Sequence, residues 1–280
     1  MPPEALKPLL EEATQRLAQA GCETPQLDAR LLLQSATGLS REEMILEPSR
    51  PVEPQAAALF RAYIGRREKH EPVSRILGER EFYGRAFRVT PDVLDPRPDT
   101  ETLITAALRH MPKGARLLDL GTGSGAIAVT LLSERPDASG IATDLSPAAL
   151  AVAQSNAARH GVLPRLDLVE GRWFAQVVGR FDIIVSNPPY IPERDIAELS
   201  PDVRNFDPRL ALVGGADGLD PYRAIASGAT AHLAEGGHVL VEIGAGQAQD
   251  VVAIFAGSGF QALGHYHDLG GHARCLAFRR

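Results

Sequence analysis

The chain has 280 residues, of which 44% are hydrophobic and 5% aromatic, so it can bury a sizeable core and is too apolar to remain disordered. Its net charge of −6 is uneven, because residues 1–88 carry 13 basic and 13 acidic side chains, and residues 89–280 carry 16 and 22. The acidic larger part disfavours a duplex nucleic acid as substrate, since such binding depends on neutralising phosphates.

Cysteine usage and the N-terminus indicate the compartment. Cys22 and Cys275 lie too far apart to form a metal spacing and are too few for a disulfide framework. No apolar run approaches the roughly 20 residues that cross a membrane. The chain starts with Met-Pro-Pro-Glu-Ala, which has no basic segment followed by an apolar one. We therefore expect a reduced cytoplasmic protein with no membrane partner.

Three amphipathic segments predict a small helical domain over residues 1–72. Leucines at helical spacing mark a first helix over 4–20 and a second over 26–36, and Pro54 starts a third. This domain has no evident cluster of catalytic side chains. Its expected task is to hold a protein partner or to cover the site.

The spacing of the hydrophobic residues changes from a helical to a strand pattern after the helical segments. Residues 73–90 contain two short strands around a turn at Gly84, which predicts a β-hairpin that links two domains. A proline-rich stretch over 91–101 then leads into a helix that ends near Met111.

Residues 91–280 predict an α/β catalytic domain with a doubly wound, mostly parallel, seven-stranded sheet. From Arg116 onward strands and helices alternate, which is typical of this class. The expected strands are 116–120, 139–144, 165–169, 181–185, 237–243, 260–266 and 273–278. The last two are too close in sequence for a helix between them, so they should form an antiparallel hairpin at one edge.

A glycine-rich turn follows the first expected strand. Its sequence is Gly121, Thr122, Gly123, Ser124 and Gly125. Such glycines let the backbone approach a ligand closely, and the next helix offers free N–H groups to an anion. Asp144 ends the second strand, where its carboxylate can accept both hydroxyls of a ribose. These features alone fit NAD and S-adenosylmethionine about equally, so a nicotinamide-dependent oxidoreductase is one alternative.

A second motif favours methyl transfer. Asn187, Pro188, Pro189 and Tyr190 follow the strand over 181–185, and the two prolines stiffen the backbone as it leaves the sheet. The Asn187 side-chain oxygen and the Pro188 carbonyl can accept both N–H bonds of a planar NH₂ group and stabilise the charge that develops on its nitrogen. Tyr190 can stack on the flat group. Hydride transfer has no need of such acceptors.

These motifs resemble the bacterial HemK/PrmC family of peptide-chain release factor glutamine methyltransferases, over nearly the whole chain. The shared stretches are Glu71-Pro72 to Gly78, Arg80-Glu81-Phe82-Tyr83, Pro96-Arg97-Pro98-Asp99-Thr100-Glu101, Asp119 to Gly125, Asn187 to Pro192, and Asp268-Leu269-x-Gly271-x-x-Arg274. The stretch Pro96-Arg97-Pro98-Asp99-Thr100-Glu101 is specific to this family and its nearest relatives. Asp95 departs from the pattern, because an apolar residue is usual before Pro96.

The resemblance implies S-adenosyl-L-methionine as methyl donor and S-adenosyl-L-homocysteine as product. The residues implied to bind it are Gly121, Thr122, Gly123, Ser124, Gly125, Asp144, Asn187, and Trp173 beside the adenine. The implied substrate is the glutamine of the Gly-Gly-Gln loop in class-1 release factors. Asn187, Pro188 and Tyr190 would be catalytic, and Pro189 would complete the substrate contact. The helical domain would contact the release factor, and we expect a monomer.

Two other methyl acceptors remain open. One is a glutamine of a large-subunit ribosomal protein; the other is the adenine N6 of a nucleic acid, which the acidic charge disfavours. His265, His267 and His272 could face one another, but no acid or cysteine lies at a matching spacing, so we expect no metal.

Overall fold

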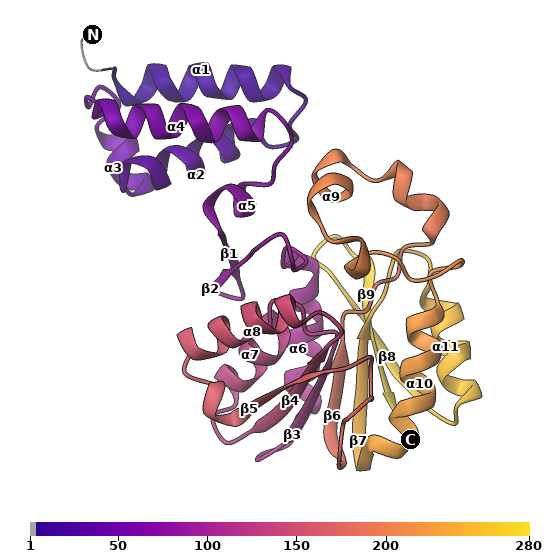
Figure 1. Ribbon diagram of the computed structural model, residues 1–280. Coiled ribbons are helices and arrows are strands. Elements are labelled where there is room, and N and C mark those ends of the chain that lie inside the picture. Colours follow the sequence, from indigo (N-terminus) through magenta and orange to yellow (C-terminus); the bar gives the residue numbers. More distant parts are fainter. Residues whose placement is uncertain (1–3) are drawn as a thin grey trace. The chain divides into compact units, whose positions relative to one another are not determined.

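The computed structural model describes residues 4–280, which divide into two compact units (Figure 1). The helical unit contains residues 4–78 and Pro201–Phe206, and the sheet unit contains Glu79–Ser200 and Asp207–Arg280. Residues 1–3, part of the N-terminal start considered above, lie outside the described residues. No helix among the described residues is both long and apolar enough to cross a membrane.

The helical unit consists of short helices around their own core. Within its described residues these are α1 (Leu6–Gln19), α2 (Pro25–Thr37), α3 (Arg41–Leu46), α4 (Pro54–Arg67), α5 (Val73–Leu77) and α9 (Pro201–Phe206). The three predicted helices are therefore present, as α1, α2 and α4. Leu17, Leu32, Phe60 and Ile64 are almost fully buried where these helices meet, which gives this unit an apolar cluster separate from the sheet.

Three helices of this unit, α3, α5 and α9, were not predicted. α3 begins with a capping box, in which Ser40 and Glu43 each bond the other's backbone N–H, so the sequence did carry its signal. α5 lies at the start of the stretch that was predicted as a hairpin. The hairpin itself is confirmed for β1 (Glu79–Phe82) and β2 (Arg85–Arg88), which pair antiparallel.

The sheet unit, over its described residues, contains the seven-stranded sheet that the sequence predicted. Its strands are β3 (Arg116–Leu120), β4 (Ser139–Asp144), β5 (Leu166–Glu170), β6 (Phe181–Ser186), β7 (Leu233–Glu242), β8 (Gln261–His267) and β9 (Ala273–Arg279). They lie in the order β5-β4-β3-β6-β7-β9-β8. β3 to β7 are parallel, and β8 and β9 form the antiparallel hairpin expected at one edge.

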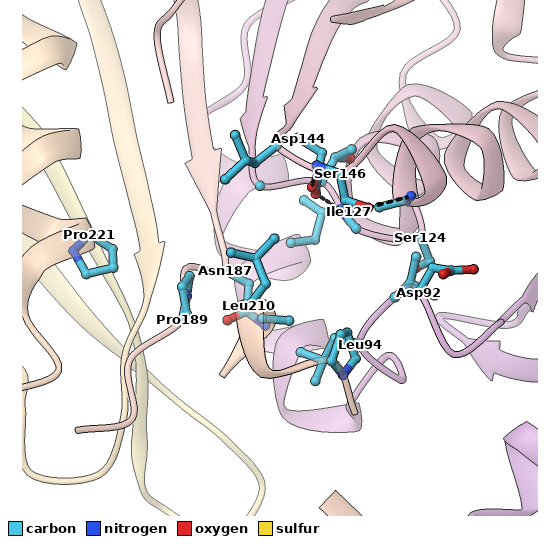
Figure 2. A pocket seen from close by; sticks show the side chains of 18 of the residues that line it. Asp92, Leu94, Ser124, Ile127, Asp144, Ser146, Asn187, Pro189, Leu210 and Pro221 are labelled. Carbon is cyan, nitrogen blue, oxygen red and sulfur yellow. Dashed lines mark hydrogen bonds between the residues drawn. The ribbon is translucent and has the colours of Figure 1, made fainter. Parts of the chain in front are cut away.

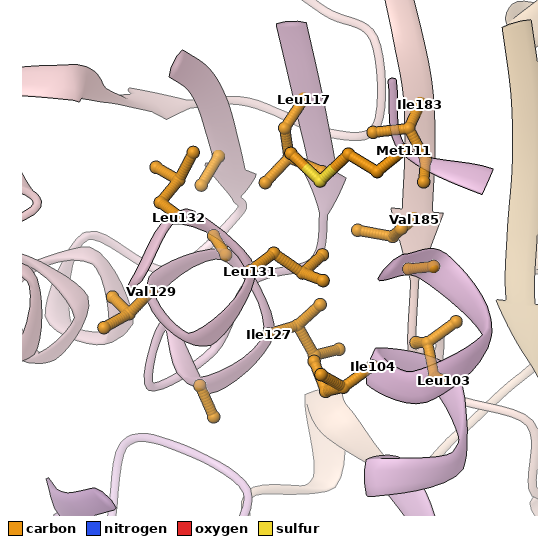
Figure 3. Close-up of a cluster of buried hydrophobic side chains, with 14 of the residues drawn as sticks. Leu103, Ile104, Met111, Leu117, Ile127, Val129, Leu131, Leu132, Ile183 and Val185 are labelled. Atoms are coloured by element: carbon orange, nitrogen blue, oxygen red, sulfur yellow. The ribbon is translucent and has the colours of Figure 1, made fainter. Parts of the chain in front are cut away.

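Helices cover both faces of this sheet (Figure 1). They are α6 (Glu101–His110), α7 (Ala126–Glu134), α8 (Pro147–Arg159), α10 (Asp220–His232) and α11 (Ala248–Gly257). Short 3₁₀ turns are η1 (Pro98–Thr100), η2 (Leu163–Arg165), η3 (Glu193–Glu198) and η4 (Arg209–Ala211). Figure 3 shows Leu103 and Ile104 of α6 and Ile127 and Leu131 of α7 packed with Val185 of β6. α11 was not predicted, although Val251 and Phe255, four residues apart, are both fully buried.

The strand order places a switch point between β3 and β6. The chain leaves β3 toward β4 on one side and returns to β6 on the other. In open α/β sheets ligands bind in the crevice outside the carboxyl ends of such strands. The loops after β3 and β6, which hold the two predicted motifs, both begin at this crevice.

Candidate active site

A cavity of about 660 Å³ opens at the carboxyl ends of β3, β4 and β6. Asp144 from β4 and Asn187 from the end of β6 both border it (Figure 2). The predicted residues that line it are Gly121, Thr122, Gly123, Ser124, Asp144, Trp173, Asn187 and Pro189. Gly125, Pro188 and Tyr190 do not line it. The structure thus brings most of the predicted site together around one hollow.

Gly125 packs against a helix instead of facing the cavity. A Cβ added there would lie 3.1 Å from the Ala153 side chain of α8, and the residue has a φ of 80°, which favours glycine. Asn156 of α8 also donates from Nδ2 to the Ser124 carbonyl at 2.8 Å. α8 therefore fixes the glycine turn from behind, a contribution that the sequence motif did not reveal.

Asp144 is held in place by backbone amides. Its Oδ2 accepts from Gly123 N at 2.8 Å, and its Oδ1 accepts from Ser146 N at 2.9 Å. A carboxylate has about four lone-pair sites, so both oxygens keep acceptor capacity. The side chain is thereby fixed with room to accept the two hydroxyls of a ribose.

Asp119 orients the glycine turn. Its Oδ2 accepts from Thr122 Oγ1 at 2.6 Å, and the side chain is completely buried. Burial raises the pKa of Asp119 to about 7, against the lowering effect of the Thr122 hydrogen bond. Of the two roles open to this residue, orienting the loop or touching a ligand, its burial favours the first.

Trp173 borders the cavity beside the glycine turn. Its ring atom Cζ3 lies 3.9 Å from where a Gly121 Cβ would be, and its carbonyl accepts from Thr143 Oγ1 at 3.2 Å. Its φ of 54° is unusual for an aromatic residue, so the surrounding structure must impose it. A half-buried flat ring at this place suits a planar base.

Asn187 is tied to the proline-rich stretch. Its Nδ2 donates to Oγ1 of Thr100 in η1 at 3.1 Å. Thr100 is buried and also borders the cavity. The stretch that identified the family in the sequence is therefore in direct contact with the residue expected to meet the substrate.

Tyr190 packs against the apolar cluster that contains Tyr222 and Val241. Gln247 Nε2 donates to its carbonyl at 2.9 Å, which fixes the backbone after the two prolines. Burial raises the pKa of Tyr190 well above its usual value, so the phenol stays neutral at physiological pH. It can stack or donate, but it cannot act as a phenolate base.

Glu242 is a buried acid beside the site that sequence reasoning missed. It ends β7, its side chain is 2% exposed, and burial raises its pKa to about 7 although hydrogen bonds from Thr100 and Asn187 lower it. The signal was present in the sequence, since an acid at the end of the apolar run Val239–Val241 is unusual.

The unusual Asp95 lies near one arginine, although its Oδ1 has no hydrogen-bond partner among the described residues. Arg80 Nη1 of β1 lies 3.9 Å from its carboxylate, which is buried. Asp207, also buried, accepts from Arg97 Nη2 at 2.6 Å and from the Asp95 backbone N at 3.4 Å. Two buried acids therefore lie among two arginines at the base of the proline-rich stretch.

Family models match both parts of the chain. Residues 8–78 match the model described as PrmC N-terminal domain, and residues 97–199 match the one described as Methyltransferase small domain.

Curated relatives are similar over almost their full length. The release factor glutamine methyltransferase of Cereibacter sphaeroides is 52% identical over 270 residues, which cover 96% of each chain. That of Agrobacterium fabrum is 48% identical over 274 residues, 96% of this chain and 95% of the relative. That of Moorella thermoacetica is 42% identical over 285 residues, which cover 98% of this chain and 99% of the relative.

Solved structures are similar in the sheet. A ribosomal protein L11 methylase from Lactobacillus delbrueckii subsp. bulgaricus has a TM-score of 0.53 and 24% identity over 69% of this chain and 84% of that chain. A methyltransferase from Pyrococcus furiosus has a TM-score of 0.55 and 20% identity over 70% of this chain and 89% of that chain. At these identities the likeness concerns the fold, and it confirms the predicted class.

Proposed function

The chain belongs to the release factor glutamine methyltransferase family, and on this basis we propose that it methylates the side-chain amide nitrogen of the Gly-Gly-Gln glutamine in class-1 peptide chain release factors. One observation carries the proposal. Asn187 borders the same cavity as the glycine turn and Asp144, so a methyl donor and an amide can meet there.

The residues present fit S-adenosylmethionine. Asp144 keeps free acceptor capacity for the ribose, Trp173 offers a flat surface to the adenine, and the turn after β3 leaves space for the donor. When bound, this cofactor supplies an electrophilic methyl group, which passes to the nitrogen as its bond to sulfur breaks.

Asn187 and Pro188 supply the acceptors that an amide nitrogen needs. Its lone pair is delocalised, so it reacts only if the positive charge that develops on it is stabilised. In this proposal the Asn187 side-chain oxygen and the Pro188 carbonyl accept its two N–H bonds and Tyr190 stacks on the flat group, although Pro188 and Tyr190 do not line the cavity itself. No strong base is needed, because an N-methylated, positively charged amide loses its proton readily to water.

The helical unit is proposed to contact the release factor. Its match to the PrmC N-terminal domain supports this role, as do exposed apolar side chains at Ile45 (65% exposed) and Leu46 (79%). We further propose that the chain acts in the cytoplasm as a monomer. We also propose that its substrate is a protein and not duplex nucleic acid, because its net charge of −6 disfavours binding to phosphates.

Mass spectrometry of defined substrates tests the proposal. A purified class-1 release factor and a large-subunit ribosomal protein are each incubated with the enzyme and S-adenosylmethionine, and an adenine-containing oligonucleotide serves as a third substrate. We expect one added methyl on the release-factor glutamine. A methyl found only on the ribosomal protein or only on adenine would assign the chain to one of the alternatives.

A further inference from the structure

We propose that Glu242 is a positioning residue, which acts through Thr100 to hold the Asn187 amide with its oxygen toward the substrate. The inference rests on the proposed function, since it concerns the same amide. It adds two residues, from β7 and η1, to the machinery of the reaction.

Strand register brings Glu242 to Asn187. β6 and β7 are parallel, and Ser186 lies opposite Val241. The next residue of each strand is Asn187 on one and Glu242 on the other, so they lie side by side at the carboxyl edge of the sheet. Thr100 completes the group, because its hydroxyl accepts from Asn187 Nδ2 at 3.1 Å.

While Glu242 is ionised, the hydrogen bonds among the three polar groups can run in only one direction. An ionised carboxylate only accepts hydrogen bonds, and a hydroxyl donates one. Thr100 donates to Glu242 and accepts from Asn187, and Asn187 also donates toward Glu242; both bonds lower the pKa of the carboxyl. The NH₂ end of Asn187 must therefore face Glu242, which leaves its oxygen for the substrate.

Two other buried acids are paired with arginines, whereas Asp119, like Glu242, is buried with one carboxylate oxygen that has no hydrogen-bond partner among the described residues. Asp28 accepts from Arg67, and Asp207 accepts from Arg97. Among the described residues, Glu242 has no such ion pair, and its Oε2 has no hydrogen-bond partner although it is buried. The nearby Arg274 pairs instead with Asp99 and Asp268, at 2.9 and 2.8 Å.

This arrangement is costly for the fold. A buried, unpaired carboxylate destabilises the folded state, and a neutral or apolar residue would be more stable there. Its presence beside Asn187 is explained if it orients the amide.

The test compares four single variants and one double variant with wild type. Thr100→Val removes the hydroxyl but keeps the shape, Thr100→Ser keeps the hydroxyl, and Glu242→Gln removes the charge. Thr130→Val is the matched control, because Thr130 is completely buried in α7 and its hydroxyl has no hydrogen-bond partner among the described residues. Single-turnover methylation of a release factor gives the rate, and calorimetry with S-adenosylhomocysteine gives the cofactor Kd.

We expect Thr100→Val and Glu242→Gln each to lower the methylation rate on the order of tenfold, the loss of one oriented hydrogen bond, with the cofactor Kd within about twofold of wild type. Thr100→Ser should recover most of the rate, and Thr130→Val should match wild type. The double variant Thr100→Val with Glu242→Gln should lose less than the product of the two single losses, since both break one chain.

A readout without substrate separates this inference from the proposed function. In ¹⁵N-labelled protein, the side-chain amide protons of Asn187 should shift in Thr100→Val and not in Thr130→Val. If wild type fails to methylate the release factor, the proposed function fails and this signal still tests the contact. An unchanged signal in Thr100→Val, or an unchanged rate in an active enzyme, would overturn the inference.

Discussion

Asn187 is the residue on which the chemistry depends most. It borders the cavity, and Thr100 fixes its NH₂ end. We expect Asn187→Ala to lower kcat on the order of 10²–10³, the scale for losing one oriented stabilising group. The Kd for S-adenosylhomocysteine, measured by calorimetry, should change little. Near-normal turnover of this variant would refute the role assigned to Asn187.

Glu242 links activity to stability through pH. Burial raises its pKa from 4.5 to about 7, so the unfolded chain releases this proton at a lower pH than the folded protein does. The free energy of unfolding should then fall as pH rises from about 4.5 to about 7, by on the order of 3 kcal/mol for this group. Asp99 and Cys275 lie near it, as do Arg274 and Tyr190.

Glu242→Gln is neutral at every pH, so it should raise the melting temperature by about 5–10 °C at pH 8 and hardly at pH 5. Glu11→Gln, at an exposed acid of α1, should show the same small difference at both pH values. The buried Asp119 titrates in wild type and in Glu242→Gln alike, so its contribution cancels when the two melting temperatures are compared. A gain in stability that is equal at pH 5 and pH 8 would contradict the burial of an ionisable carboxyl.

Some residues of the candidate site could be predicted from the sequence, and others could be identified only from the structure. The glycine turn, Asp144 and Asn187 belong to contiguous motifs whose chemistry can be argued locally, and the structure brings them to one cavity. Glu242 and Asn156 act on those motifs from other elements. Their contacts depend on strand register and on the packing of α8, which no local pattern specifies.

At the scale of the element, α8 fixes the turn after β3. Gly125 and Gly161 have φ values of 80° and 70°, but a Cβ would meet Ala153 only at Gly125 and has free space at Gly161. Gly161→Ala should cost about 1–2 kcal/mol of backbone strain. Gly125→Ala should cost about 1–3 kcal/mol more, because α8 must shift, and it should weaken S-adenosylhomocysteine binding.

Urea unfolding and calorimetry on both variants measure these effects. Gly161→Ala reports the backbone cost alone, so the difference between the variants isolates the contact with Ala153. Equal losses in the two variants would show that α8 does not hold the turn.

The helices and strands were predicted correctly where the hydrophobic periodicity and the turn-forming or capping residues indicated the same boundaries. β3 and β4 match their predicted bounds, and α8 begins at Pro147 directly after its capping residue Ser146. The helices that were missed are short or lack a clear boundary: α3 has six residues, α5 five, and α11 follows its strand after a brief loop. α9 has six residues and belongs to the helical unit although its sequence lies far downstream, which only the folded contacts reveal.

At the scale of the whole molecule, the two units have separate cores and should respond separately to mutation. In the helical unit the buried Arg67 bonds Asp28 and Asp202, both at 2.7 Å. Arg67→Leu leaves the buried Asp28 without its charge partner and should destabilise this unit by about 3–5 kcal/mol. Hydrogen exchange should rise in residues 4–78 while S-adenosylhomocysteine affinity stays unchanged.

Arg61 on the same helix is the matched control. It pairs with Glu4 at the surface, so Arg61→Leu should cost about 1 kcal/mol or less. A rise in exchange across the sheet unit in Arg67→Leu, or a loss of cofactor affinity, would show that the two cores do not act independently.

The central claim is that one cavity holds a methyl donor next to the side chain of Asn187. A crystal structure of the protein with S-adenosylhomocysteine tests it most directly. We expect the ribose hydroxyls on Asp144, the adenine beside Trp173, and the sulfur facing Asn187. A sulfur that points away from Asn187, toward the far side of the cavity, would contradict the account.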